Sequence, residues 1–146
     1  MPRRLTRAAV RLLDSAARLA GRTPQIAPHQ ATGRRGEEEA YFYLRRHGYV
    51  MVARNWRSPH RKGELDLIGW DGDVLCFIEV KTRSSRDFMP AEAAVDQEKH
   101  RALCAIARDY LRRTSGRPPT RFDVVSIYCE NKSTDITLFK GAFSLS

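Results

Sequence analysis

Two apolar runs on either side of the four residues Trp70-Asp71-Gly72-Asp73 constrain the fold more than any other feature of the sequence. The runs cover Leu65–Ile68 and Val74–Thr82, and Asp-Gly between apolar runs is a strong signal for a tight hairpin turn. The segment therefore predicts two antiparallel strands. Because side chains alternate along a strand, the position of the turn decides which residues share a face.

The remaining segments complete a mixed pattern of helices and strands. We expect a helix over residues 37–47, which Gly48 would end, and a long helix over Glu92–Arg113. We expect further strands over Tyr49–Ala53, Phe122–Cys129 and Ile136–Phe139. The order helix, three strands, helix, two strands predicts a single α/β domain with a mixed sheet, in which the long helix permits a crossover to a parallel strand.

Acidic and basic side chains meet on the hairpin. Glu79 and Lys81 are two residues apart, so they share a strand face, and the apolar residues beside them take the other face. Pairing across an Asp71-Gly72 turn places Asp66 opposite Phe77 and diagonal to Glu79, roughly 7–8 Å away at Cα. We therefore expect one acid from each strand on one face, with a lysine beside them.

Glu37 adds a carboxylate from the preceding helix. On a helical wheel it lies in register with the apolar residues Ala40, Tyr41 and Leu44. An acid aligned with an apolar stripe tends to be buried or directed at a partner. Helix N-termini also favour acids through the helix dipole, so this ordinary explanation of Glu37 stays open.

These four residues suit a Mg²⁺ or Mn²⁺ site. Mg²⁺ prefers carboxylate and water oxygens, and such an ion can activate a water molecule for attack on a phosphodiester. We expect Asp66 and Glu79 as ligands and Glu37 as an accessory ligand. Lys81 would hold the attacking water or offset charge in the transition state. A salt-bridge cluster of Asp66, Glu79 and Lys81 is the alternative, since alternating charges are common on half-exposed strands.

Positive charge is concentrated near the N-terminus. Of the net charge of +9, residues 1–35 supply +7, from eight arginines and the single acid Asp14. Residues 3–20 predict a basic amphipathic helix and residues 21–33 a linker. We therefore expect a basic arm with its linker over 1–35 and a folded domain over 36–146. The arm suits contact with DNA or anionic lipid, and a transit peptide or a plain extension also fits it.

Several polar side chains around the hairpin are candidate contacts to nucleic-acid phosphates. They are Arg54, Arg57, Arg61, Lys62, Arg83, Arg86, Gln97 and Lys99. For Gln97 and Lys99, plain solvation on a helix surface is the alternative. Trp56 either stacks on an unpaired base or belongs to the core. The histidines lack the spacing of a zinc site, and the sequence has no phosphate-binding glycine loop.

Cysteines and hydropathy indicate the compartment. Cys76, Cys104 and Cys129 lie far apart and form no C-x-x-C pair, so we expect buried free thiols in a reducing cytoplasm. No run approaches the roughly 18 apolar residues of a membrane span. The sequence predicts a soluble cytoplasmic protein with no transmembrane segment and no small-molecule cofactor.

A series of motifs resembles the YraN-type family of uncharacterised bacterial proteins. In order, they are Arg35-Gly36-Glu37, Asn55-Trp56-Arg57, Gly63-Glu64-Leu65-Asp66-Leu67-Ile68, Ile78-Glu79-Val80-Lys81-Thr82-Arg83, Arg121-Phe122-Asp123-Val124-Val125 and Ala142-Phe143. The resemblance implies a restriction-endonuclease-like fold related to Holliday-junction resolvases. It implies PD-(D/E)xK metal and catalytic positions at Asp66, Glu79 and Lys81. It further implies that Glu37 is the first-helix acid and allows a homodimer, as in resolvase-like enzymes.

These observations together predict a nucleic-acid-binding protein that acts as a divalent-metal-dependent endonuclease on structured or branched DNA. Two other classes stay open. One is a nucleic-acid-binding module of the same fold that does not cut, and the other is an adaptor docked through the basic arm. The complete set of two acids and a lysine favours cutting, because a module that only binds has no need of Lys81 beside both acids.

Overall fold

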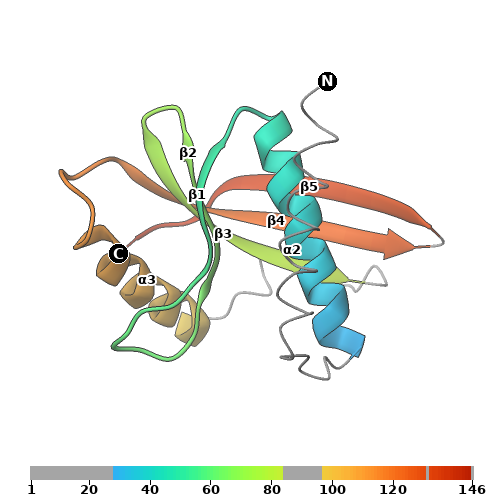
Figure 1. Cartoon of the computed structure of the whole chain (residues 1–146), viewed down its shortest axis with the longest axis horizontal. Coiled ribbons are helices and arrows are strands. Elements are labelled where there is room, and N and C mark those ends of the chain that lie inside the picture. The colour runs from blue at the N-terminus through green and yellow to red at the C-terminus, as the bar shows by residue number, and fades with distance from the viewer. Residues whose placement is uncertain (1–27, 84–96, 131, 146) are drawn as a thin grey trace, which may run out of the picture. The chain divides into compact units, whose positions relative to one another are not determined.

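The computed structural model describes residues 28–83, 97–130 and 132–145. The chain divides into two compact units, 1–30 and 31–146, and nearly all described elements belong to the second. Its elements are α2 (Pro28–Arg46), β1 (Val50–Trp56), β2 (Leu65–Asp71), β3 (Val74–Arg83), α3 (Gln97–Leu111), β4 (Thr120–Glu130) and β5 (Ser133–Phe143). The strands form one sheet in the order β1-β2-β3-β4-β5 (Figure 1).

The expected α/β class with a mixed sheet is confirmed. β1, β2 and β3 pair antiparallel, β3 and β4 pair parallel, and β4 and β5 pair antiparallel. The parallel pair requires a long connection, since parallel strands cannot be joined by a tight turn, and α3 lies within that connection. Among the described residues, neither helix has the length and apolar character needed to cross a lipid bilayer.

The β2–β3 hairpin forms as expected, but its turn lies one residue later. Asp71 pairs with Val74, so Gly72 and Asp73 are the two turn residues, and the pairing expected between Trp70 and Asp73 is wrong. Gly72 has a φ of 59°, and a positive φ at the first turn residue is what a type II′ hairpin turn requires. The register between the strands therefore shifts by two residues, and the pairing expected between Asp66 and Phe77 is also wrong, because Phe77 pairs with Ile68. A shift of two residues leaves the same side chains on the same face, so Asp66 still shares a face with Glu79.

The two faces of the sheet carry two apolar clusters, each covered by one helix. α3 packs on a cluster formed with Leu65, Ile68, Leu75, Phe77 and Phe122. α2 packs on a cluster formed with Tyr49, Leu67, Cys76, Ile78, Val125 and Ile127. The strands in the middle of the sheet are therefore buried on both faces, whereas β1 and β5 form its edges.

The helix α2 begins at Pro28 rather than at residue 37, so the linker expected over 21–33 is wrong from Pro28 onward. Gly33 and Gly36 suggest a break, but isolated glycines are tolerated inside a helix that packs well. Gly36 in fact permits the packing, because a Cβ there would collide with the side chain of Thr82 on β3. The boundary expected after residue 35 falls inside this helix, and residues 1–27 lie outside the described residues.

A buried polar network fixes the far end of the hairpin. Asp123 on β4 is fully buried and accepts hydrogen bonds from the Tyr49 hydroxyl at 2.9 Å and from the Arg121 guanidinium at 2.7 Å. Arg121 also bonds Asp71 beside the turn, as does Lys140 on β5. The network thus joins β2, β4 and β5 beside the turn of the hairpin.

The cysteines are free, as expected, but only Cys76 and Cys104 are buried. Cys129 is exposed because it lies near the end of β4, beyond the part of the strand that α2 covers.

Candidate metal centre

The candidate site lies where β2 and β3 separate. The paired residues of the hairpin end at Leu67 and Ile78. One residue beyond Leu67, the Asp66 carboxylate accepts a hydrogen bond of 2.8 Å from the Val80 backbone amide. The side chain takes the position that a strand carbonyl has in a regular ladder, and this contact fixes the Asp66 carboxylate between the strands.

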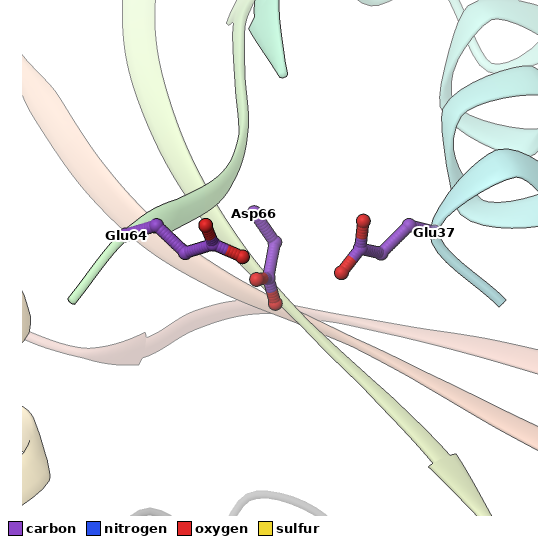
Figure 2. A group of neighbouring side chains, drawn as sticks. All are labelled: Glu37, Glu64 and Asp66. Carbon is purple, nitrogen blue, oxygen red and sulfur yellow. The ribbon is translucent and has the colours of Figure 1, made fainter. Parts of the chain in front are cut away.

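Three carboxylates converge beside this point. Glu37 extends from α2, Glu64 immediately precedes β2, and Asp66 follows two residues later, and Figure 2 shows the three side chains directed toward one another. One oxygen of each lies within 4.8 Å of the others. Glu64 and Asp66 reach the same side because alternate residues of an extended segment share a face.

Two neighbours hold the outer carboxylates. The Asn55 side-chain amide donates a hydrogen bond of 2.8 Å to Glu37. The Arg57 guanidinium approaches one Glu64 oxygen through two nitrogens, each at 3.0 Å. Both residues come from the end of β1 and the segment after it, so the connection between β1 and β2 organises this side of the site.

Glu79 lies on β3 and is held by two lysines. It is only 7% exposed, and its Oε1 contacts Lys99 of α3 at 2.5 Å and Lys81 at 3.3 Å. The charge of its carboxylate also acts on Asp66 and raises the pKa of that carboxyl. The expected acids Asp66 and Glu79 and the expected Lys81 are therefore brought together. Among the described residues, however, the converging group pairs Glu37 and Asp66 with Glu64 rather than with Glu79.

The crowding of acids changes the protonation of Asp66. Burial, and then the neighbouring Glu79 charge, raise the pKa of Asp66 to about 8, and the Val80 amide offsets only part of this effect. Burial also lowers the pKa of Lys81, with a further contribution from Lys99. For Lys99, burial alone would lower the pKa, but the contacts with Glu79 outweigh it and raise the pKa.

The converging carboxylates fit a divalent cation. Metal–oxygen distances of about 2.0–2.6 Å place the ligand oxygens around one ion roughly 3–5 Å apart. The ligand oxygens of Glu37, Glu64 and Asp66 all lie within 4.8 Å of one another, which meets that requirement. The ligand atoms are all carboxylate oxygens, which suits Mg²⁺ or Mn²⁺ and not a thiophilic metal. The raised pKa of Asp66 also means that one proton must leave before all three oxygens can serve as ligands.

Several of the expected phosphate contacts have partners within the protein. Arg54 lies over the Tyr41 ring, with its guanidinium carbon 5.2 Å from the centroid. Arg61 forms an ion pair with Asp109 on α3 at 3.0 Å. Lys62 and Gln97 are exposed, Arg83 is half-buried, and Arg86 lies outside the described residues. Trp56 belongs to the core edge, since it is half-buried and packs edge-on against Tyr110.

Glu64 and Asn55 are site residues for which the sequence pattern predicted no individual role. Both lie inside motifs that support the family resemblance. For Glu64 a usable signal exists, because it is two residues before Asp66 in an extended segment and must share its side. For Asn55 the sequence carries no comparable signal, since its contact to Glu37 depends on how α2 packs beside β1.

The fold and site together define an α/β protein with an acidic cluster and two lysines at the divergence of two strands. A family model described as "Uncharacterised protein family UPF0102" matches residues 36–127. The chain belongs to this family, and the resemblance to YraN-type proteins is confirmed.

Relatives carry the same family name. A UPF0102 protein of Koribacter versatilis is 54% identical over 141 residues, which cover 97% of this chain and 96% of that protein. One from Solibacter usitatus is 50% identical over 112 residues, covering 76% and 84%. One from Bacteroides thetaiotaomicron is 37% identical over 118 residues, covering 81% and 96%. These names state no activity.

Proposed function

We propose that this protein is a divalent-metal-dependent endonuclease that hydrolyses phosphodiester bonds in structured or branched DNA. The observation that carries the proposal is the convergence of Glu37, Glu64 and Asp66 beside a buried Glu79 that holds two lysines. A surface salt-bridge cluster has no reason to gather three carboxylates on one point, because like charges at this distance repel.

Each side chain has a distinct task in the proposed reaction. Glu37, Glu64 and Asp66 would hold Mg²⁺ or Mn²⁺, with Glu79 beside Asp66 as the fourth acid. When bound, the cation supplies Lewis acidity to the phosphodiester and lowers the pKa of a water molecule. Lys81 places an ammonium group beside these acids, where it can hold the attacking water or stabilise charge on the phosphate oxygens.

Lys99 suits contact with the substrate phosphate. Its side chain is 39% exposed while its ammonium contacts the buried Glu79, so it connects the site to solvent. A lysine in this position can move from Glu79 to a phosphate oxygen once a cation satisfies the acids. Arg57, which contacts Glu64, is the second candidate for such a contact, because the Arg57 side chain is 77% exposed.

The proposal includes a restriction-endonuclease-like fold. Supporting it are the mixed five-stranded sheet with a helix on each face, the position of two acids and a lysine on the β2–β3 hairpin, and the acid on α2. Holliday-junction resolvases, to which this family is similar, give the proposal its branched-DNA substrate.

The test is a cleavage panel of linear, single-stranded, flapped and four-way DNA with Mg²⁺ or Mn²⁺. Wild-type protein should cut at least one structured substrate. Asp66→Asn and Glu64→Gln should reduce the rate by at least about 100-fold, the scale of losing one essential electrostatic contact. Asp73→Asn, which removes an exposed acid in the hairpin turn, is the matched control and should leave cutting unchanged.

One observation favours a second candidate, a module that binds nucleic acid without cutting. Glu79 is already neutralised by Lys81 and Lys99, as it would be in a purely structural ion-pair cluster. DNA binding by wild-type protein with no cutting of any substrate, and no effect of Mn²⁺, would establish this second function and exclude the first.

A further inference from the structure

Asn55 has an unusual backbone conformation at a position beside the candidate metal centre. Its φ is 47°, in the left-handed region that L-residues seldom adopt and that asparagine tolerates better than most. On either side, Arg54 pairs with Leu67 and Trp56 pairs with Leu65. Asn55 therefore stands across from Asp66, so a residue of β1 with a positive φ faces the site's central acid.

The neighbours of Asn55 keep this conformation in place. Arg54 lies over the Tyr41 ring of α2, and Trp56 packs edge-on against Tyr110 of α3. β1 is thus fixed to both helices immediately before and after Asn55. A left-handed residue between two anchored neighbours has little freedom to relax, so the direction of its side chain is set by the fold.

That side chain makes one described contact, and the contact reaches a proposed ligand. The Asn55 amide nitrogen donates to Glu37 Oε2 at 2.8 Å. Glu37 is the only converging acid that comes from a helix, and it must extend across to reach Glu64 and Asp66. A donor on one oxygen holds the carboxylate in place while its other oxygen stays available to a cation.

We propose that Asn55 is a positioning residue of the metal centre, which acts by holding the Glu37 carboxylate toward Asp66. This inference rests on the proposed function, since it assumes that the carboxylates bind a divalent cation. The positive φ of Asn55 directs its side-chain amide toward Glu37, and the hydrogen bond then orients the Glu37 carboxylate. Residues that hold a metal ligand through a hydrogen bond commonly change metal affinity about 10- to 100-fold when removed.

Asn55→Gly separates this role from a purely conformational one. Glycine adopts a positive φ without strain, so the strand keeps its shape while the donor to Glu37 is lost. Lys132→Gly is the matched control, because Lys132 has a φ of 68° in the turn between β4 and β5 and belongs to neither the site nor its partners. Both variants should melt at the wild-type temperature in the absence of metal.

The experiment measures Mn²⁺ binding to the full-length chain by the loss of the free-Mn²⁺ electron paramagnetic resonance signal. Asn55→Gly should weaken binding about 10-fold or more, and Lys132→Gly should bind as the wild type does. In a Glu37→Ala background, adding Asn55→Gly should cause no further loss, because the two residues act through one contact.

The outcomes distinguish the metal centre itself from the positioning role of Asn55. Wild-type protein that does not bind Mn²⁺ overturns the proposed metal centre and the role of Asn55 with it. Wild-type binding that Asn55→Gly leaves unchanged overturns the role of Asn55 alone. Equal losses from Asn55→Gly in the presence and absence of Glu37 would show that Asn55 does not act through Glu37, and would also overturn the inference.

Discussion

Asp66 is half-buried and Asp109 is buried, and their surroundings shift the pKa values of the two carboxyls in opposite directions. The Ser58 hydroxyl and the guanidinium of Arg61 hold the pKa of Asp109 below its usual range. Burial and the nearby Glu79 raise the pKa of Asp66 to about 8. Asp109 therefore has the partners of a structural acid that joins α3 to the segment before β2. Burial and the Glu79 charge instead disfavour the ionised form of Asp66, so that form lowers the free energy of unfolding.

This contrast predicts mutational effects of opposite sign. An acid with a raised pKa in the folded state binds more protons there than in the unfolded chain, so its contribution falls as pH rises from about 4 to 8. In metal-free protein, Asp66→Asn should therefore raise the free energy of unfolding at pH 8 by roughly 2 kcal/mol or more, given about 1.4 kcal/mol per pKa unit. The gain should vanish near pH 4, as urea denaturation at both pH values will reveal.

Asp109→Asn is the matched control and should destabilise the protein at neutral pH. The folded-state pKa of Asp109 is lowered, so its stabilising effect is present above the unfolded pKa and lost as pH falls through the folded pKa. Loss of stability in both variants at pH 8 would contradict the account of Asp66, and would mean that its carboxylate is a structural partner of the Val80 amide alone.

Proton release should accompany cation binding. Because a ligand carboxyl must be deprotonated, Mn²⁺ competes with the proton on Asp66. The apparent affinity should rise about tenfold per pH unit below pH 8 and level off above it. Calorimetry in two buffers of different ionisation enthalpy measures the protons released, and an affinity that is flat between pH 6 and 8 would rule out Asp66 as the titrating ligand.

Residue patterns in the sequence predict part of the site. The shared face of Glu79 and Lys81 follows from strand periodicity alone, and Asp66 follows from an even-length turn. The contact between Lys99 and Glu79 does not, because it depends on where α3 crosses the sheet. The roles of Glu64 and Asn55 depend on a short connection whose path no periodicity describes.

At the level of elements, the helix α2 provides a pair of glycines in contrasting surroundings. A Cβ at Gly33 would meet no atom within 4 Å, whereas one at Gly36 would collide with Thr82. Gly33→Ala should stabilise the protein by about 0.5–1 kcal/mol through helix propensity. Gly36→Ala should destabilise it by about 1–3 kcal/mol and weaken Mn²⁺ binding, since it displaces the helix one residue before Glu37.

Thermal melts of the two alanine variants measure this difference directly. Adding Thr82→Ala to Gly36→Ala should recover part of the lost stability by removing the atoms nearest the new methyl group. Similar melting temperatures for Gly33→Ala and Gly36→Ala would mean that α2 does not depend on this close approach to β3.

Elements were predictable where the pattern is local. The hairpin, the parallel crossover and the two final strands follow from apolar runs and connection lengths, although β5 extends beyond the expected Ile136–Phe139 to cover Ser133–Phe143. The expected strand was shorter because β5 lies at the exposed edge of the sheet, where about half of its residues are polar and form no apolar run. The start of α2 was not predictable, since packing overrides the glycine signal.

For the whole molecule, the distribution of charge predicts how DNA affinity depends on salt. Residues 1–27 hold six arginines and Asp14, and they precede α2, which begins at Pro28. On duplex DNA each neutralised phosphate adds about −0.9 to the slope of log K against log salt. The truncated chain should lose several units of slope while its cutting rate at saturating DNA stays unchanged. Full-length chain with the same six arginines replaced by glutamine should lose as much slope as the truncated chain. An unchanged slope in both variants would show that the arm does not contact DNA.

The register between β3 and β4 has a consequence for how the site forms during folding. Asp71 and Val74 meet across a two-residue turn, but Leu75 meets Thr120, and closing so long a loop is slow compared with forming a hairpin. Asp66 and Glu79 therefore come together early, on a hairpin, whereas Lys99 reaches Glu79 only when α3 has docked. We therefore expect Asp66 and Glu79 to meet before Lys99 can offset their charge, and a divalent cation bound between the two acids at that point would favour the hairpin.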